Sequence, residues 1–207
     1  MSSLPTKGVF MKTIGLTGGI ASGKTLISDW FEKVNIEVID ADKVYKALIK
    51  TNKNLYQEIV DTFSLDYQED QTLDFRRLAR IVFNDKDKLK KLNEITHPYV
   101  IREMERLIAY FNEKGEDILI LDIPLLYEAK MEKYCDNIIC VYTDRETQID
   151  RLMKRGYLER KTAEKRIDAQ MSLKEKKEKA DFVIDNSSSR DNSYQQFKHI
   201  LAQIKSE

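Results

Sequence analysis

The residues best suited to chemistry lie near the amino end, in the run Gly18-Gly19-Ile20-Ala21-Ser22-Gly23-Lys24-Thr25. A glycine, four intervening residues and then Gly-Lys-Thr is the spacing of a phosphate-binding loop. Glycine lets the backbone adopt positive φ and approach a ligand closely, so that the N–H groups of such a loop can point at an anion. The helix expected after the loop adds the positive end of its dipole.

In a loop of this kind the lysine reaches the β- and γ-phosphates, and the threonine hydroxyl binds Mg²⁺. Lys24 and Thr25 are therefore the predicted catalytic lysine and metal ligand, and the predicted cofactors are ATP and Mg²⁺. A short apolar run precedes the loop, and apolar residues at helical spacing follow it, which is the context that the motif requires. The expected nucleotide contacts are Gly19, Ile20, Ala21, Ser22, Gly23, Lys24, Thr25 and Leu26.

Acidic residues follow two other apolar runs. Asp40 and Asp42 come directly after the run that includes Val38 and Ile39, and Asp122 ends the run 118–121. The carboxyl ends of parallel strands form the ligand-binding edge of an open α/β sheet. A carboxylate at Asp42 can accept a proton from an attacking hydroxyl or help to hold the metal, and Asp40 can orient Asp42 or the metal-bound water. Asp122 can contact Mg²⁺ through water. The alternatives are that Asp42 only caps a helix and that Asp122 is structural.

Further candidates lie elsewhere along the chain. His97 can donate to a phosphate or ribose, although a lone histidine is often structural. Arg151 and Arg155 are four residues apart and share a helix face, and Arg166 follows after a break at Gly156. We interpret these arginines as a phosphate-clamping lid, although they can equally be a solvated surface. The alternating charges of 174–179 indicate a solvated helix face.

Five apolar runs, 13–17, 37–40, 117–122, 137–142 and 182–185, predict the strands. They are continuous rather than alternating, as expected of a parallel sheet that is covered on both faces. The predicted fold class is therefore α/β: a five-stranded parallel sheet flanked by helices, as in P-loop NTPases, with a helical insert and a helical lid. The expected parts are a flexible extension (1–12), a nucleotide-binding core (13–43, 114–143 and 181–207), the insert (44–113) and the lid (144–180).

Composition restricts the class of protein. The 207 residues are 42% hydrophobic and 34% charged with a net charge of zero, which is typical of a globular protein and does not favour nucleic acid as a partner. No run approaches the length of a membrane span. Cys135 and Cys140, expected on opposite faces of one strand, suit neither a metal site nor a mutual disulfide, so we expect a reduced, cytoplasmic protein. A monomer is expected, although an oligomer is possible.

From Met11 onward the chain resembles the dephospho-CoA kinase family. The shared motifs are Leu16–Thr25, Val38–Asp42, His97-Pro98, Asp122–Glu128, Arg166–Gln170 and Ala180–Asn186. The resemblance implies ATP-dependent phosphorylation of the ribose 3′-hydroxyl of dephospho-CoA, the last step of coenzyme A synthesis. It further implies that the insert binds CoA, that Asp42, His97, Pro124, Leu125 and Arg166 contact the substrate, and that the turn 184–187, which includes Asn186, contacts adenine. Ala21 stands where many members have glycine.

Two other functions fit the phosphate-binding loop. A nucleoside or nucleotide kinase would share the core and the lid and would differ in its acceptor. A GTPase-like switch would use the loop for binding alone, but the chain contains no Asn-Lys-x-Asp string to read guanine.

Overall fold

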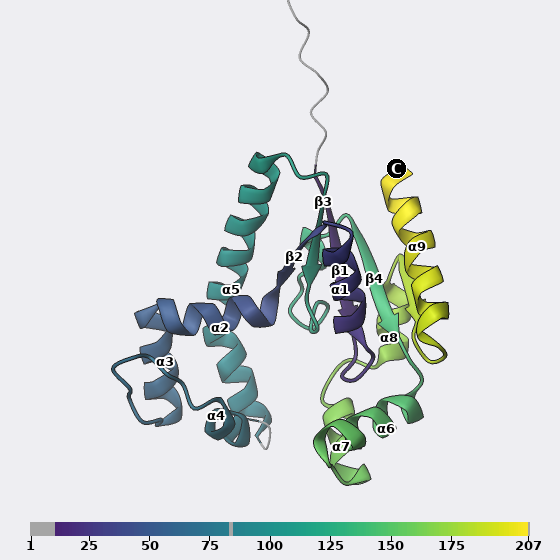
Figure 1. Ribbon diagram of the computed structural model, residues 1–207. Helices are drawn as coiled ribbons and strands as arrows, with labels where there is room; N and C mark the ends of the chain where they lie inside the picture. Colours follow the sequence, from purple (N-terminus) through teal and green to yellow (C-terminus); the bar gives the residue numbers. More distant parts are fainter. Residues whose placement is uncertain (1–10, 83–84, 207) are drawn as a thin grey trace, which may run out of the picture. The chain divides into compact units, whose positions relative to one another are not determined.

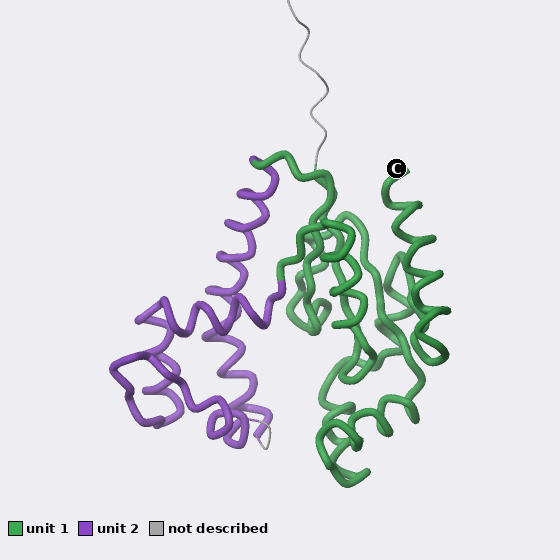
Figure 2. The backbone as a smooth tube through the Cα atoms, viewed as in Figure 1, with its two compact units in different colours: residues 1–39, 114–207 green, residues 40–113 purple. Residues whose placement is uncertain are grey.

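The structure is a computed structural model that describes residues 11–82 and 85–206. Within them the chain divides into two compact units (Figure 2), the first comprising 11–39 and 114–206 and the second 40–82 and 85–113. Of the expected extension, 1–10 lies outside the described residues. Lys12, however, begins the first strand, and Met11 is buried, so the prediction of a flexible extension was wrong at these two residues.

The first unit is built on a sheet with the strand order β2-β3-β1-β4-β5 (Figure 1). Its strands are β1 (Lys12–Gly18), β2 (Glu37–Asp40), β3 (Ile118–Asp122), β4 (Asn137–Tyr142) and β5 (Phe182–Asp185). β1 pairs in parallel with β3 and β4, with Ile14 opposite Ile120 and Leu16 opposite Ile139. β5 pairs in parallel with β4. The predicted five-stranded parallel sheet is confirmed.

Two helices cover one face of this sheet. They are α1 (Lys24–Lys33) and α9 (Arg190–Ser206), and their aromatic residues meet over the strands. The Phe31 and Phe197 rings are 4.9 Å apart, and both belong to the core cluster that contains Ile14 and Leu16. The central strand is thus buried deeply enough to hold the loop at its carboxyl end in place.

The expected lid segment belongs to the first unit and forms three helices. These are α6 (Arg145–Gly156), α7 (Arg160–Asp168) and α8 (Leu173–Lys179). α6 ends where Tyr157 adopts a left-handed φ of 47°, one residue after Gly156. A short 3₁₀ turn, η1 (Glu132–Tyr134), precedes β4. Cys135 follows this turn and lies outside the strand, so the prediction that both cysteines belong to one strand was wrong.

The second unit is helical, with α2 (Ala41–Thr51), α3 (Lys53–Phe63), α4 (Phe75–Val82) and most of α5 (Lys86–Lys114). Its core includes Leu55, Tyr56 and Ile59, each fully buried. α5 runs through Pro98 without interruption. The apolar residues of α5 keep their helical spacing on both sides of Pro98. The helix therefore continues even though proline has no N–H to donate to the preceding turn.

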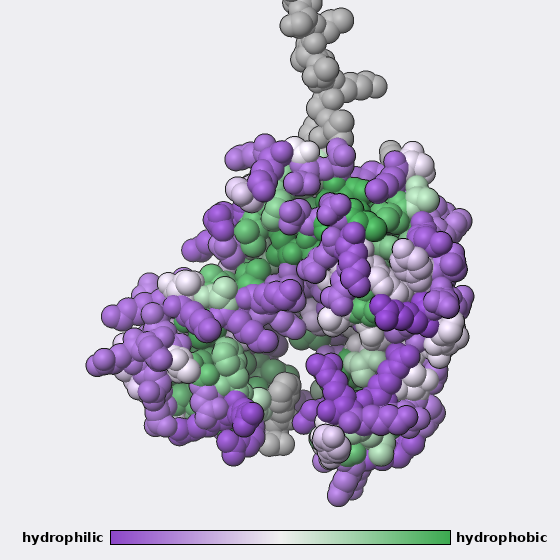
Figure 3. Space-filling model, viewed as in Figure 1, coloured by the Kyte–Doolittle hydropathy of each residue, from purple (hydrophilic) through white to green (hydrophobic). Residues whose placement is uncertain are grey.

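Hydrophilic residues predominate on the face of the molecule shown in Figure 3. Among the residues that the structure describes, no helix is both long and apolar enough to cross a bilayer.

Candidate active site

The phosphate-binding loop joins β1 to α1 in the first unit. Gly23 precedes the helix with a φ of 94°, a left-handed conformation that favours glycine. Ala21 also adopts a left-handed φ, of 61°, which costs an alanine about 1 kcal/mol. Ala21 therefore adopts the left-handed conformation that glycine adopts more easily, at some cost in backbone energy.

Several amides of the loop already donate within the protein. The Ser22 N–H donates to the Gly19 carbonyl oxygen (3.1 Å), and the Leu26 N–H donates to that of Gly23 (3.0 Å). The N–H groups of the first turn of a helix have no acceptor inside that helix. Lys24 and Thr25 begin α1, so their amides lie at the positive end of the α1 dipole, where an anion is stabilised.

Lys24 is held by a carboxylate. Its Nζ donates to Oδ1 of Asp122, the last residue of β3, and both side chains are largely buried. β1 and β3 are adjacent in the sheet, with Leu16 opposite Asp122. The end of β3 and the start of α1 are thus brought together, and the ion pair between Lys24 and Asp122 fixes the lysine beside the loop. Thr25 lies next to Lys24 and is exposed.

Two predicted residues lie against the loop from the other side. The Asn186 side-chain amide donates to the Ser22 carbonyl oxygen (2.8 Å). Arg151, on α6, donates to the same oxygen (3.4 Å) and to the Asn186 carbonyl oxygen (2.8 Å). Asn186 is 6% exposed, and its Oδ1 accepts from the Ser193 hydroxyl (2.9 Å). Asn186 therefore supports the loop, while Arg151 is half-buried beside it.

The segment after Asp122 is tied down at Pro124. The Pro124 carbonyl oxygen accepts from the Thr17 hydroxyl (3.1 Å) and from Lys176 Nζ (2.7 Å). Pro124 and Leu125 are each partly exposed. Lys176 also pairs with Glu128 at 2.9 Å and is completely buried. The prediction that the run 174–179 is a solvated helix face was therefore wrong at Lys176, because this residue and Leu173 form the inner face of α8.

Asp40, Asp42 and His97 belong to the second unit. Asp40 is the N-cap of α2, and its Oδ1 accepts from the Asp42 and Lys43 N–H groups (2.9 and 3.0 Å). The capping residue is thus Asp40, and the alternative that Asp42 caps the helix was wrong. Asp42 is exposed in the first turn of α2. His97 is half-buried in α5, and burial lowers the pKa of its imidazole.

The remaining predicted arginines lie farther along the lid segment. Arg155 is exposed near the end of α6, and Arg166 is exposed on α7. Sequence reasoning gave no role to Gln148 or Gln170, although both contact the backbone of Ile20. Gln170 ends a motif that the chain shares with a known family, and that was the signal available for it.

Known proteins of one family are similar to this chain along most of its length. Residues 12–192 match the family model described as dephospho-CoA kinase. A dephospho-CoA kinase of Lactobacillus johnsonii is 40% identical over 192 residues, which cover 92% of this chain and 97% of the relative. One of Carboxydothermus hydrogenoformans is 43% identical over 193 residues, covering 93% and 94%.

A solved structure is similar as well. The dephospho-CoA kinase of Campylobacter jejuni superposes with a TM-score of 0.70 at 27% identity, covering 93% of this chain and 96% of its own. The motif, the fold and the match along most of the chain agree: this chain belongs to the dephospho-CoA kinase family, which uses ATP in the final step of coenzyme A synthesis.

Proposed function

We propose that this chain carries out the family's reaction by transferring the γ-phosphoryl group of ATP to the ribose 3′-hydroxyl of dephospho-CoA. The observation that carries the proposal is the phosphate-binding loop with Lys24 fixed beside it by Asp122. A cation held in place stabilises the charge on a transferring phosphoryl group without having to reorganise during the reaction.

The nucleotide would be bound by residues 19–26. The first-turn amides of α1 would donate to the phosphates, and the α1 dipole would add to their effect. Asn186 would support the loop, because its hydrogen bond to the Ser22 carbonyl oxygen fixes the backbone next to Gly23.

Thr25 and Asp122 would hold Mg²⁺. A hydroxyl and a carboxylate are the hard oxygen ligands that this ion prefers. No cluster of three or more His, Cys, Asp or Glu side chains suited to a metal occurs in 11–82 or 85–206. That fits Mg²⁺, which usually takes one or two protein ligands and completes its shell with water and substrate phosphates. When bound, the ion would neutralise charge on the phosphates. Asp122, already paired with Lys24, suits contact through water.

The acceptor would be bound by the second unit. We propose that the helical segment 44–113, including His97, binds dephospho-CoA, and that Pro124, Leu125 and Arg166 of the first unit also contact this substrate. Asp42 would orient the 3′-hydroxyl and accept its proton. The capping bonds of Asp40 to the Asp42 and Lys43 amides support this role, because they fix the backbone that carries Asp42.

Arg151 and Arg155 would stabilise the transferring phosphoryl group from α6. Arg151 is the stronger candidate, because it is half-buried against the loop and its guanidinium donates to Ser22 and Asn186. Arg155 lies one turn farther along the same helix and is exposed.

We also propose that the protein acts in the cytoplasm, as a monomer and on small molecules. Its cysteines are free, and burial raises the pKa of both the Cys135 and the Cys140 thiol to about 12. Thiols with such a high pKa react slowly, which suits a protein that needs no disulfide.

Incubation with Mg-ATP and a panel of acceptors tests the proposal. Dephospho-CoA should gain one phosphate, measured by mass, while adenosine and AMP should gain none. Phosphorylation of a nucleoside or nucleotide in place of dephospho-CoA would favour the alternative kinase. Saturable GTP binding without any acceptor turnover would favour a switch.

Asp42→Asn tests the proposed base. This variant should bind ATP as the wild type does, because Asp42 is assigned to the acceptor, and its kcat should fall on the order of 10²-fold or more. Asp61→Asn, an exposed change in α3 of the same unit, is the matched control. An Asp42→Asn enzyme with full activity would remove Asp42 from this role.

A further inference from the structure

Two glutamine side chains hold the backbone of Ile20 at the apex of the phosphate-binding loop. The Ile20 N–H donates to Oε1 of Gln170 (3.1 Å), and Nε2 of Gln148 donates to the Ile20 carbonyl oxygen (2.8 Å). One glutamine therefore accepts and the other donates. Both polar groups of a single backbone residue are satisfied by side chains more than a hundred residues away in the chain.

Hydrophobic packing acts on the same residue. The Ile20 side chain packs against a cluster formed by α6 and α7, which includes Ile149, Leu152 and Ile167. Gln148 belongs to α6, and Gln170 follows the end of α7. The segment expected to act as a lid is thus attached to the loop apex by two hydrogen bonds and by packing.

The lack of a side chain at Gly19 leaves space for the Gln148 side chain. A Cβ atom at Gly19 would lie 2.6 Å from Nε2 of Gln148, a distance that real Cβ atoms essentially never show. Any other residue at this position would displace the side chain that donates to Ile20. Gly19 has a negative or extended φ, so its small size, rather than a left-handed backbone, explains why glycine fits here.

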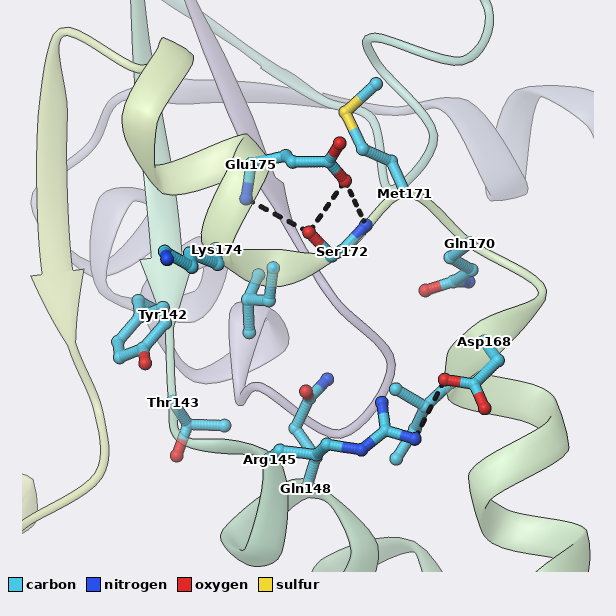
Figure 4. A pocket seen from close by; sticks show the side chains of 12 residues that line it. Tyr142, Thr143, Arg145, Gln148, Asp168, Gln170, Met171, Ser172, Lys174 and Glu175 are labelled. Atoms are coloured by element: carbon cyan, nitrogen blue, oxygen red, sulfur yellow. Dashed lines mark hydrogen bonds and ion pairs between the residues drawn. The ribbon is translucent and has the colours of Figure 1, made fainter.

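The two glutamines also line one pocket of about 390 Å³, which lies between the end of β4 and the lid helices (Figure 4). Arg145 and Asp168 form an ion pair across its edge at 2.8 Å. Gln148 is 3% exposed, whereas Gln170 is half-buried. Because the polar groups of Ile20 are occupied by the glutamines, its amide is not available to a phosphate in this arrangement.

We propose that Gln148 and Gln170 are positioning residues for phosphoryl transfer. They act through Ile20: by fixing its N–H and C=O groups they set the orientation of the following loop amides, which donate to the nucleotide in the proposed function on which this inference rests. Neither glutamine touches the substrate in this role. The proposal predicts that each matters through the direction of its hydrogen bond and not merely through its presence.

Replacing each glutamine by glutamate tests that prediction, because glutamate can accept a hydrogen bond but, when ionised, cannot donate one. Gln170→Glu keeps the acceptor for the Ile20 N–H, so its affinity for a non-hydrolysable ATP analogue should stay within about threefold of wild type. Gln148→Glu replaces a donor by a carboxylate facing the Ile20 carbonyl oxygen, so its affinity should fall by about tenfold or more.

The two variants add the same charge near the same backbone residue, Gln148→Glu at a buried position and Gln170→Glu at a half-buried one. Gln203→Glu, on the exposed side of α9, controls for the substitution elsewhere. The affinity for the ATP analogue and the KM for dephospho-CoA are measured together with thermal unfolding. A purely structural role would lower the active fraction and leave the affinity of the folded protein for ATP unchanged.

Equal affinities in both glutamate variants, whether lowered or not, would overturn the proposal. If Gln148→Glu fails to fold because its carboxylate is buried, Gln148→Met and Gln170→Leu give the second test. Each removes one hydrogen bond to Ile20 without adding charge. Both should weaken ATP binding about tenfold and leave the KM for dephospho-CoA unchanged, and wild-type affinity in both would refute the proposal.

Discussion

Lys24 is fixed beside the phosphate-binding loop by its ion pair with Asp122. Lys24 is the first residue of α1, Asp122 the last of β3, and their side chains meet with little exposure. A flexible lysine loses conformational freedom when it is fixed, and here the neighbouring carboxylate offsets that loss. Asp122 therefore has a role in positioning Lys24 whether or not it also contacts a metal.

His97 gives a prediction about pH. Burial lowers the pKa of its imidazole, so the folded protein keeps it neutral at pH values where the unfolded chain binds a proton. The unfolded state then binds more protons than the folded state as the pH falls through about 6.5, so the free energy of unfolding decreases on acidification. His97→Gln should lose less stability than wild type between pH 7.5 and 5.5, measured by urea unfolding.

The matched control for this experiment is His199→Gln, which changes an exposed histidine of α9. If the stability of His199→Gln depends on pH as that of the wild type does, the change seen in His97→Gln is specific to position 97. Identical slopes in wild type and His97→Gln would show that burial of this imidazole does not contribute to the pH dependence.

At the scale of elements, α8 is attached to the segment after β3 through one buried lysine. Lys176 donates to the Pro124 carbonyl oxygen and pairs with Glu128, whose carboxylate also accepts from the Met171 N–H (3.0 Å). Four hydrogen-bonding groups thus meet here, two from the segment that begins at Ile123 (Pro124 and Glu128) and two from α8 or just before it (Lys176 and Met171). This arrangement fixes the backbone next to Asp122.

Lys176→Met should therefore destabilise the protein. It removes one partner of a buried pair and leaves the Pro124 carbonyl oxygen without its lysine donor, which should lower the free energy of unfolding by about 3 kcal/mol. The exposed Lys174→Met, on the same helix, should change it by less than about 0.5 kcal/mol. Combining Lys176→Met with Glu128→Leu measures the coupling. Additive losses in this double variant would mean that the two side chains do not interact.

The strands and the phosphate-binding loop could be predicted because their signals are local. A continuous apolar run marks a buried strand, and the glycine spacing marks the loop. Lys176 could not be identified in this way, since a charged run resembles a solvated helix face until its partner at Glu128 is known. Gln148 and Gln170 were missed for the same reason: their acceptor and donor belong to Ile20, more than a hundred residues earlier in the chain.

At the scale of the whole molecule, the proposed sites fall into two units. The loop, Lys24, Asp122 and Arg151 belong to the first, whereas Asp42 and His97 belong to the second. Each unit has its own core, the first around the sheet and the second around Leu55, Tyr56 and Ile59. Under the proposed assignment ATP would bind the first unit and dephospho-CoA the second, so each ligand would stabilise a different unit.

Hydrogen exchange tests this division. A ligand that binds the folded state stabilises it by mass action, by about 2.7 kcal/mol at a hundred times its Kd, so exchange by unfolding slows in the region that it binds. A non-hydrolysable ATP analogue should protect peptides covering 19–26 in the first unit, and dephospho-CoA should protect peptides from α2 and the middle of α5 in the second. The variant Lys24→Met, with weakened phosphate binding, should lose the first protection and keep the second. Protection of the second unit alone by the ATP analogue would contradict the assignment of the nucleotide to the loop, and protection confined to the first unit by dephospho-CoA would move the acceptor site out of 44–113.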